Sequence, residues 1–170
     1  MFPAIWKNYI LPILSRPAQF QVAGLCYRAA PEGLQVLLIT SRETRRWILP
    51  KGWPMAGLKA SGAAVMEAWE EAGVKPTSKP PKKVGRYRYP KITSGGVPVD
   101  TDVDVYAIEV GSLSQDFPEA GERTRQWVSA QEAAERVNEP DLSALLLEFP
   151  EQIRGTNPAP MPKNKSEAQS

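Results

Sequence analysis

Three glutamates, Glu67, Glu70 and Glu71, lie within five residues in the stretch GWPMAGLKASGAAVMEAWEEAGV, which runs from position 52 to position 74. On a helix, residues three and four positions apart share a face, so the three carboxylates would lie together. Like charges so spaced destabilise an isolated helix by about a few tenths of a kcal/mol per pair. Such hard oxygen ligands suit Mg²⁺ or Mn²⁺, usually shared with substrate phosphates. A solvated acidic face on an amphipathic helix is the alternative interpretation.

The residues between the glutamates predict how this helix packs. Apolar side chains at 65, 68, 69 and 72 fall on the opposite face, which we expect to turn toward the core. Ala63 and Ala64 lie one turn before the acids, and their small size would leave room for a ligand above the carboxylates.

Composition narrows the chemistry. The 170 residues fit one domain with a sizeable core, and they include no histidine and a single cysteine, Cys26. Histidine bases, histidine metal ligands and internal disulfides are thereby excluded, and catalysis must use carboxylates, Lys, Arg, Tyr, backbone groups or an oxygen-held metal. The formal net charge of +2 and the lack of a nucleic-acid-binding motif argue against nucleic acid as a partner. We expect a cytoplasmic protein.

Both ends of the chain differ from its middle. Pro3, Lys7 and Pro12 interrupt the apolar N-terminus, so we expect neither a signal peptide nor a membrane span. The predicted organisation is an N-terminal arm over 1–18 that packs on the domain, a domain over 19–153 and a flexible Pro-rich tail over 154–170. The arm could form a dimer contact, so that monomer and homodimer both stay open.

The middle of the chain interleaves strand and helix patterns. Alternating apolar residues predict strands over 20–27, 34–40, 47–49, 84–89, 103–110 and 124–128. We expect a helix over 61–72, with Ser61 as its N-cap and Gly73 after its end. The capping box SAQE at 129–132 opens a second helix to about residue 137, and apolar residues spaced over 142–149 predict a third. The predicted class is α/β, a mixed sheet flanked by helices.

The stretch from Gly52 to Val74 resembles the Nudix box, whose pattern is G-x5-E-x7-R-E-U-x-E-E-x-G-U with U aliphatic. The matching residues are Gly52, Glu67, Glu70, Glu71, Gly73 and Val74. The resemblance implies the family's α/β/α sandwich and metal-dependent hydrolysis of a phosphoanhydride bond. It implies that Mg²⁺ or Mn²⁺ is held by the backbone carbonyl of Gly52 and the carboxylates of Glu67, Glu70 and Glu71. Glu67 or its neighbour Glu70 would accept the proton of the attacking water.

Two positions depart from the box. Leu58 stands where the family has a glutamate, and Met66 where it has an arginine that is thought to orient the catalytic carboxylate and brace the loop. Replacing both partners of a polar pair by apolar groups can be nearly neutral, whereas losing one strands a charge. We therefore expect Leu58 and Met66 to lie near each other or to share an apolar neighbour.

The segment RRWILPKGWP is most similar to Nudix members related to diphosphoinositol polyphosphate and diadenosine polyphosphate hydrolases. Basic side chains near the metal site would bind a small substrate that carries many phosphate groups. The candidates for substrate binding are Arg45, Arg46, Lys51, Arg86 and Arg88. For each of them, an ordinary solvated surface base is the alternative.

Glu122 is the candidate for a further metal ligand or base outside the box, since family members often supply one. A loop acid paired with Arg123 or Arg125 is the alternative. Two functions remain open: a phosphoanhydride hydrolase, and a Nudix-like module that binds a phosphorylated ligand without efficient turnover.

Overall fold

The computed structural model describes residues 19–155. The arm predicted for 1–18 and nearly all of the tail predicted for 154–170 lie outside these residues. None of the helices within 19–155 has the length and apolar character needed to cross a membrane. The elements in chain order are β1 (Gln19–Ala30), β2 (Gly33–Thr40), β3 (Trp47–Ile48), β4 (Lys51–Gly52), α3 (Ala60–Ala72), β5 (Val74–Pro76), β6 (Lys82–Ile92), β7 (Pro98–Leu113), β8 (Arg125–Ser129), α4 (Ala130–Arg136) and α5 (Pro140–Arg154).

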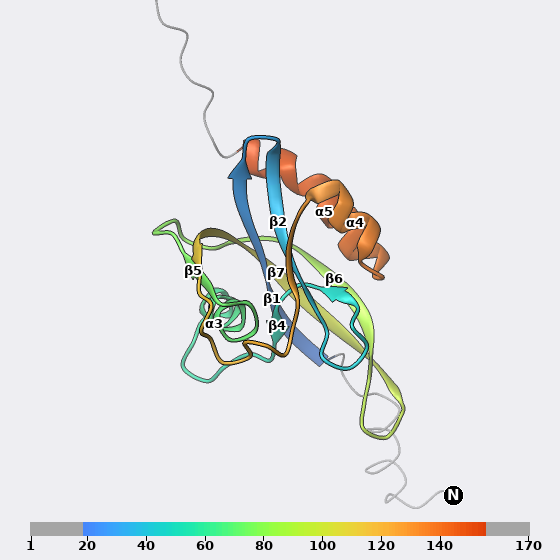
Figure 1. Cartoon of the computed structure of the whole chain (residues 1–170). Coiled ribbons are helices and arrows are strands. Elements are labelled where there is room, and N and C mark those ends of the chain that lie inside the picture. Colours follow the sequence, from blue (N-terminus) through green and yellow to red (C-terminus); the bar gives the residue numbers. More distant parts are fainter. Residues whose placement is uncertain (1–18, 156–170) are drawn as a thin grey trace, which may run out of the picture.

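The strands form a mixed sheet whose centre is the pair β1 and β7 (Figure 1). These two strands run parallel, from the pair Gln19 and Thr101 to the pair Tyr27 and Glu109. All the other pairings are antiparallel: β2 and β4 with β1, β3 and β8 with β2, and β5 and β6 with β7. The short strand β4 therefore lies directly beside the central strand β1.

Alternate residues of each central strand supply two separate cores. On one face Val22, Cys26 and Leu37 pack with the alanines of α3. On the other face Leu25 and Leu38 pack with apolar residues of α4 and α5. Figure 1 shows α3 on one side of the sheet and α4 and α5 on the other. The predicted α/β/α sandwich with a mixed sheet between helices is thus confirmed.

The strand β1 accepts α3 at very short range because residue 24 is glycine. A Cβ placed on Gly24 would lie 2.9 Å from Ile108 Cδ1 and 3.4 Å from the carbonyl oxygen of Ala64. The buried alanines Ala64 and Ala68 complete this contact from the helix side. Close packing of α3 on the sheet fixes the distance between its carboxylates and β4.

The helix α3 corrects two details of the prediction. It begins one residue earlier than expected, and Lys59 rather than Ser61 is its N-cap residue, with no side-chain cap hydrogen bond in the described chain. Gly73 ends it in the left-handed conformation, φ 67°, as the pattern predicted. The predicted core side is confirmed at positions 65, 68 and 72, while the side chain at 69 is only half-buried and the alanines at 63 and 64 are buried as well.

Other elements differ from the predictions mainly in length. The hairpin of β6 and β7 extends well beyond the expected 84–89 and 103–110. The strands β4 and β5, of two and three residues, were not predicted, because so few residues show no alternation. Ser129 caps α4 as predicted, since its hydroxyl accepts a hydrogen bond from the backbone N–H of Glu132, while the Glu132 carboxylate pairs with Arg136.

Candidate active site

A cavity of about 800 Å³ lies between α3, the loop that follows β2, β4 and the end of β6. Its charged lining residues are Arg42, Glu43, Arg46, Lys51, Glu67, Glu71, Lys91 and Arg123. Two carboxylates, Glu67 and Glu71, enter it from one face of α3, because residues four positions apart on a helix lie one above the other. The cavity therefore combines a pair of acids with a lining rich in arginine and lysine.

Glu67 lies against the backbone of β4. A Cβ placed on Gly52 would overlap the Glu67 carboxylate, so this position requires glycine for the close approach of the two. Only 9% of Glu67 is exposed, and burial raises the pKa of its carboxyl group to about 7. This value of about 7 includes smaller upward contributions from the charges of Glu71, Glu70 and Glu119, which Arg123 opposes.

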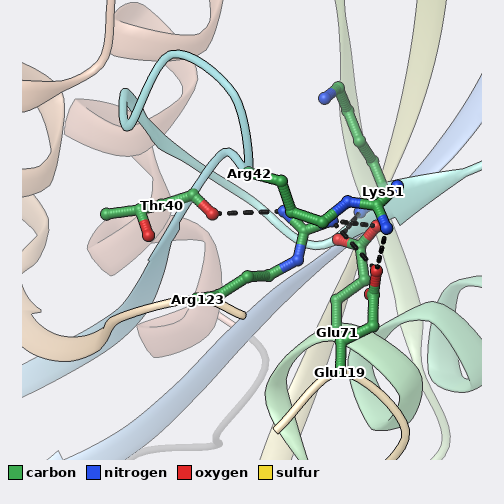
Figure 2. Close-up of polar contacts among 6 residues, drawn as sticks. All are labelled: Thr40, Arg42, Lys51, Glu71, Glu119 and Arg123. Carbon is green, nitrogen blue, oxygen red and sulfur yellow. Dashed lines mark hydrogen bonds and ion pairs between the residues drawn. The ribbon is translucent and has the colours of Figure 1, made fainter. Parts of the chain in front are cut away.

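Two donors from different elements hold the carboxylate of Glu71 (Figure 2). The backbone N–H of Lys51 in β4 donates to Oε2 at 3.2 Å, and Arg123 Nη2 donates to Oε1 at 3.3 Å. Burial raises the pKa of Glu71, whereas Arg123 and the Lys51 N–H favour the charged form and lower it. The side chain is thereby fixed in one orientation beside Glu67.

Arg123 connects this pair to the rest of the site. Its Nη1 donates to the carbonyl oxygen of Thr40 at 3.1 Å, and its Nη2 also lies 3.4 Å from Glu119 Oε1. Arg42 Nη1 lies 3.3 Å from the same oxygen of Glu119 (Figure 2). Sequence reasoning considered Arg123 only as a partner for Glu122. The i, i+4 spacing of Glu119 and Arg123 was the available signal for their pairing.

The other two predicted acids lie elsewhere. Glu70 is half-buried and is not among the described residues that line the cavity. It precedes Glu71 by one residue, so its side chain leaves the helix in a different direction from those of Glu67 and Glu71. The expected convergence of three carboxylates is therefore corrected to two. Glu122 is exposed and outside the cavity lining of the described chain, and Glu119 takes the place beside Arg123 instead. The catalytic and metal-binding roles assigned to Glu70 and Glu122 remain predictions without support from this geometry.

The predicted substrate-binding bases divide into two groups. Arg46 and Lys51 line the cavity, with Arg46 Nη1 3.4 Å from Glu139 Oε1 and the Lys51 ammonium 5.1 Å from the centre of the Tyr89 ring. Burial lowers the pKa of Lys51, and Glu71 and Glu139 oppose this effect. Lys91, which the prediction left out of the binding set, also lines the cavity and lies 4.2 Å from the Trp53 ring centre.

The remaining three bases are outside the lining, as far as residues 19–155 show. Arg86 and Arg88 of β6 form 2.7 Å hydrogen bonds with Asp104 and Asp102 of β7, so cross-strand pairs already occupy them. Arg45 is exposed at a left-handed position of the loop, φ 58°.

The donor set of the cavity fits a hard divalent cation shared with phosphate. Within residues 19–155, no group of three or more His, Cys, Asp or Glu side chains is arranged to enclose a metal on its own. Mg²⁺ commonly takes only one or two carboxylates and completes its shell with water and substrate phosphates. The pair Glu67 and Glu71, with the Gly52 backbone beside it, has the chemistry for that partial shell.

Comparison with known proteins agrees with this geometry. A family model described as the NUDIX domain matches residues 19–148. The chain belongs to the Nudix family. It is 31% identical over 115 residues to human diphosphoinositol polyphosphate phosphohydrolase 3-alpha, covering 66% of this chain and 65% of that protein. It is 33% identical over 102 residues to Nudix hydrolase 4 of Arabidopsis thaliana, covering 60% of this chain and 47% of that one. The chain thus spans less than two thirds of the length of these relatives.

Solved structures show the same Nudix fold. The crystal structure of a C. elegans Ap4A hydrolase binary complex matches with a TM-score of 0.57 at 19% identity, covering 81% of this chain and 98% of that chain. At such low identity the match supports the fold and not the substrate.

The two departures from the Nudix box lie together on the outer face of α3. Leu58, in the loop before α3, and Met66 both line an apolar groove of about 330 Å³ whose lining also includes Val65 and Trp69. The two side chains thus share apolar neighbours, as predicted. Leu58 and Met66 are 45% and 39% exposed, so a charged side chain at either position would remain in contact with water. The groove also lies apart from Glu67 and Glu71, which are absent from its lining in the described structure.

We predict that the metal-free protein loses stability as the pH rises from about 4.5 to about 7. The pKa of Glu67 is raised from 4.5 to about 7 on folding, so the folded state binds more protons in this window, and its stability is highest below it. Glu67→Gln removes this titration and should raise the melting temperature at pH 8 but not at pH 5. Thermal unfolding in a chelator at both pH values tests this, with the exposed Glu135→Gln as a matched control. An unchanged pH slope in Glu67→Gln would contradict the assignment.

We also predict that the Nudix-type polar pair can be restored at little cost. Because both positions are about half exposed, Leu58→Glu and Met66→Arg should each change the free energy of unfolding by less than about 1 kcal/mol. The double variant should be more stable than the sum of the singles, by up to about 1 kcal/mol.

Urea unfolding of the four proteins of this double-mutant cycle measures the coupling. The control combines Met66→Arg with Leu147→Glu, since Leu147 is exposed on α5. The effects of these two substitutions on the free energy of unfolding should be additive. Additivity of the Leu58 and Met66 pair as well would show that the two positions are independent.

Proposed function

We propose that this Nudix domain hydrolyses a phosphoanhydride bond of a small phosphorylated substrate with the aid of Mg²⁺ or Mn²⁺. The observation that supports it most is the buried pair Glu67 and Glu71, which lines an open cavity together with several arginines and lysines. Two buried acids without a full set of cationic partners are costly, and a site that receives a cation together with a polyanion balances them.

Glu67 is the group best suited to accept a proton. In the metal-free protein its carboxyl pKa is about 7, and a cation bound beside it would lower this pKa and keep the carboxylate charged as a proton acceptor. A bound divalent cation would supply Lewis-acid activation of a phosphoryl oxygen and of water. Glu67, Glu71 and the Gly52 backbone are the residues that would hold it, and Glu71 is already oriented by Lys51 N–H and Arg123.

The basic residues of the lining would bind the phosphates. Lys51 has no ion-pair partner within 4.0 Å in the described chain, so its ammonium is available to a phosphate oxygen. Arg46 approaches from the end of the loop, where Glu139 fixes its guanidinium. At the other side of the cavity, Trp53 and Lys91 lie in contact and offer an apolar and cationic surface to the non-phosphate part of a ligand.

The substrate class follows from the relatives and from the cavity. One relative is named a diphosphoinositol polyphosphate phosphohydrolase, and a structural neighbour is named an Ap4A hydrolase. We therefore propose a nucleoside polyphosphate, a dinucleoside polyphosphate or an inositol pyrophosphate as substrate. We also propose a cytoplasmic location, which is compatible with a chain whose single cysteine, Cys26, is buried and forms no internal disulfide.

The test is a phosphate- and nucleotide-release screen over these three substrate classes with Mg²⁺ and with Mn²⁺. We expect metal-dependent turnover that a chelator abolishes, and a loss of about 100-fold or more in Glu67→Gln, since a general base contributes that much. Glu135→Gln, an exposed glutamate on α4, is the matched control. Glu70→Gln in the same assay decides whether the third box acid takes part.

Release from none of the substrates, or full turnover by Glu67→Gln, would contradict the proposal. Tight binding of one of these ligands without release would favour instead a Nudix module that binds a phosphorylated ligand.

A further inference from the structure

We infer that Arg123 is a positioning residue that holds the Glu71 carboxylate toward the cavity. The inference rests on the proposed function and assigns a role to a residue outside the box. Arg123 lies 52 residues after Glu71 in the chain, and its side chain is only 7% exposed. It lines the same cavity as Glu71 and reaches the carboxylate directly.

The two oxygens of Glu71 are held from opposite sides. The N–H of Lys51 donates to Oε2 and Arg123 Nη2 donates to Oε1, so the two hydrogen bonds together restrict rotation of the carboxylate. Each carboxylate oxygen can accept about two hydrogen bonds or ligands, which leaves one lone pair on each oxygen for the cavity. Lys51 contributes through the rigid backbone of β4, whereas the Arg123 contact comes from a side chain and is open to mutation.

Arg123 itself is held in place by the end of β2. Its Nη1 donates to the Thr40 carbonyl, and the next residue, Thr124, bonds to Thr40 twice, through N–H to Oγ1 at 2.9 Å and through its carbonyl at 3.0 Å. The sheet therefore sets the position of the guanidinium, and Figure 2 shows it reaching from Thr40 to Glu71. A lysine has only one terminal nitrogen, so it cannot bind the Thr40 carbonyl and the Glu71 carboxylate through two separate nitrogens as Arg123 does.

The position of Arg123 carries a cost that its own hydrogen bonds do not remove. Within residues 19–155 its Nε is buried and has no hydrogen-bond partner. A buried unsatisfied donor is unfavourable, so its presence calls for a reason, of which a catalytic role is one. Orienting the acid that faces the cavity is such a reason, because groups that support metal-binding side chains are themselves needed for affinity and rate.

Arg125 provides a matched control from the same segment. Its Nη1 donates to the carbonyl oxygens of Ala72 and Ser114, both at 2.8 Å, so it also attaches this part of the chain to the end of α3. In the described structure it does not line the cavity and contacts neither Glu67 nor Glu71. A purely structural role of Arg123 would therefore be shared by Arg125.

The experiment compares Arg123→Gln, Arg123→Lys and Arg125→Gln in the full chain. We expect the two glutamine variants to lower the melting temperature similarly, while Arg123→Gln alone lowers kcat by about 10- to 100-fold with KM changed by less than about threefold. Arg123→Lys should recover part of kcat. In a Glu71→Gln background, Arg123→Gln should reduce kcat by no more than about threefold further.

Mn²⁺ affinity, measured by electron paramagnetic resonance without substrate, gives a second readout. Arg123→Gln should weaken it about fivefold or more, and Arg125→Gln should leave it unchanged. Equal effects of the two glutamine variants on kcat, a full loss that persists in the Glu71→Gln background, or tighter Mn²⁺ binding by Arg123→Gln would each overturn the positioning role. If Arg123→Gln fails to fold, Arg123→Lys decides, and parental kcat and Mn²⁺ affinity in that variant would overturn the role.

The two proposals fail in different ways. If the parent protein releases no phosphate from any substrate but binds Mn²⁺, the hydrolase proposal fails, and the Mn²⁺ comparison still decides the role of Arg123. If the parent binds no Mn²⁺, the positioning role is overturned together with the metal site.

Discussion

The burial of two carboxylates on one face of α3 is the constraint to which the rest of the site responds. Glu67 and Glu71 are each 9% exposed and lie on the same side of the helix as the alanines that pack on the sheet. Buried acids are stable only when they are neutral, hydrogen-bonded or paired with a cation. Here one acid is kept partly neutral by its surroundings, and the other is bound by a backbone N–H and an arginine.

The fold supplies these partners from distant parts of the chain. The strand β4 lies beside β1 and brings the Lys51 N–H and the Gly52 backbone to the helix, because Gly24 lets α3 pack closely on the sheet. The segment before β8 returns to the end of β2 and brings Arg123. A small shift of any of these elements would leave a buried charge without its partner, so the sandwich and the site stabilise each other.

Much of the fold could be predicted from the sequence, and the site only in part. Alternation along β1 and β2 and the spacing of the box acids are local patterns, and they identified the sheet, α3 and Glu67 with Glu71. The buried side of α3 was predicted only in part: Ala68 and Ala72 are buried and Val65 packs against the core, as expected, but Trp69 lines an outer groove. The burial of the two acids on the sheet-facing side was not predicted, because charged residues normally mark the solvent face. The contact of Arg123 with Glu71 spans 52 residues and depends on β8 pairing with β2, which no local pattern encodes.

Above all, we propose that Glu67 and Glu71 together form the binding site of a divalent cation. Anomalous difference density from a crystal of the full chain soaked in Mn²⁺ tests it most directly. We expect one strong peak within about 2.0–2.4 Å of oxygens of both carboxylates, the distance typical of a hard cation bound by oxygen. A peak bound only at another group of acids, or no peak at saturating Mn²⁺ with both side chains ordered, would contradict it.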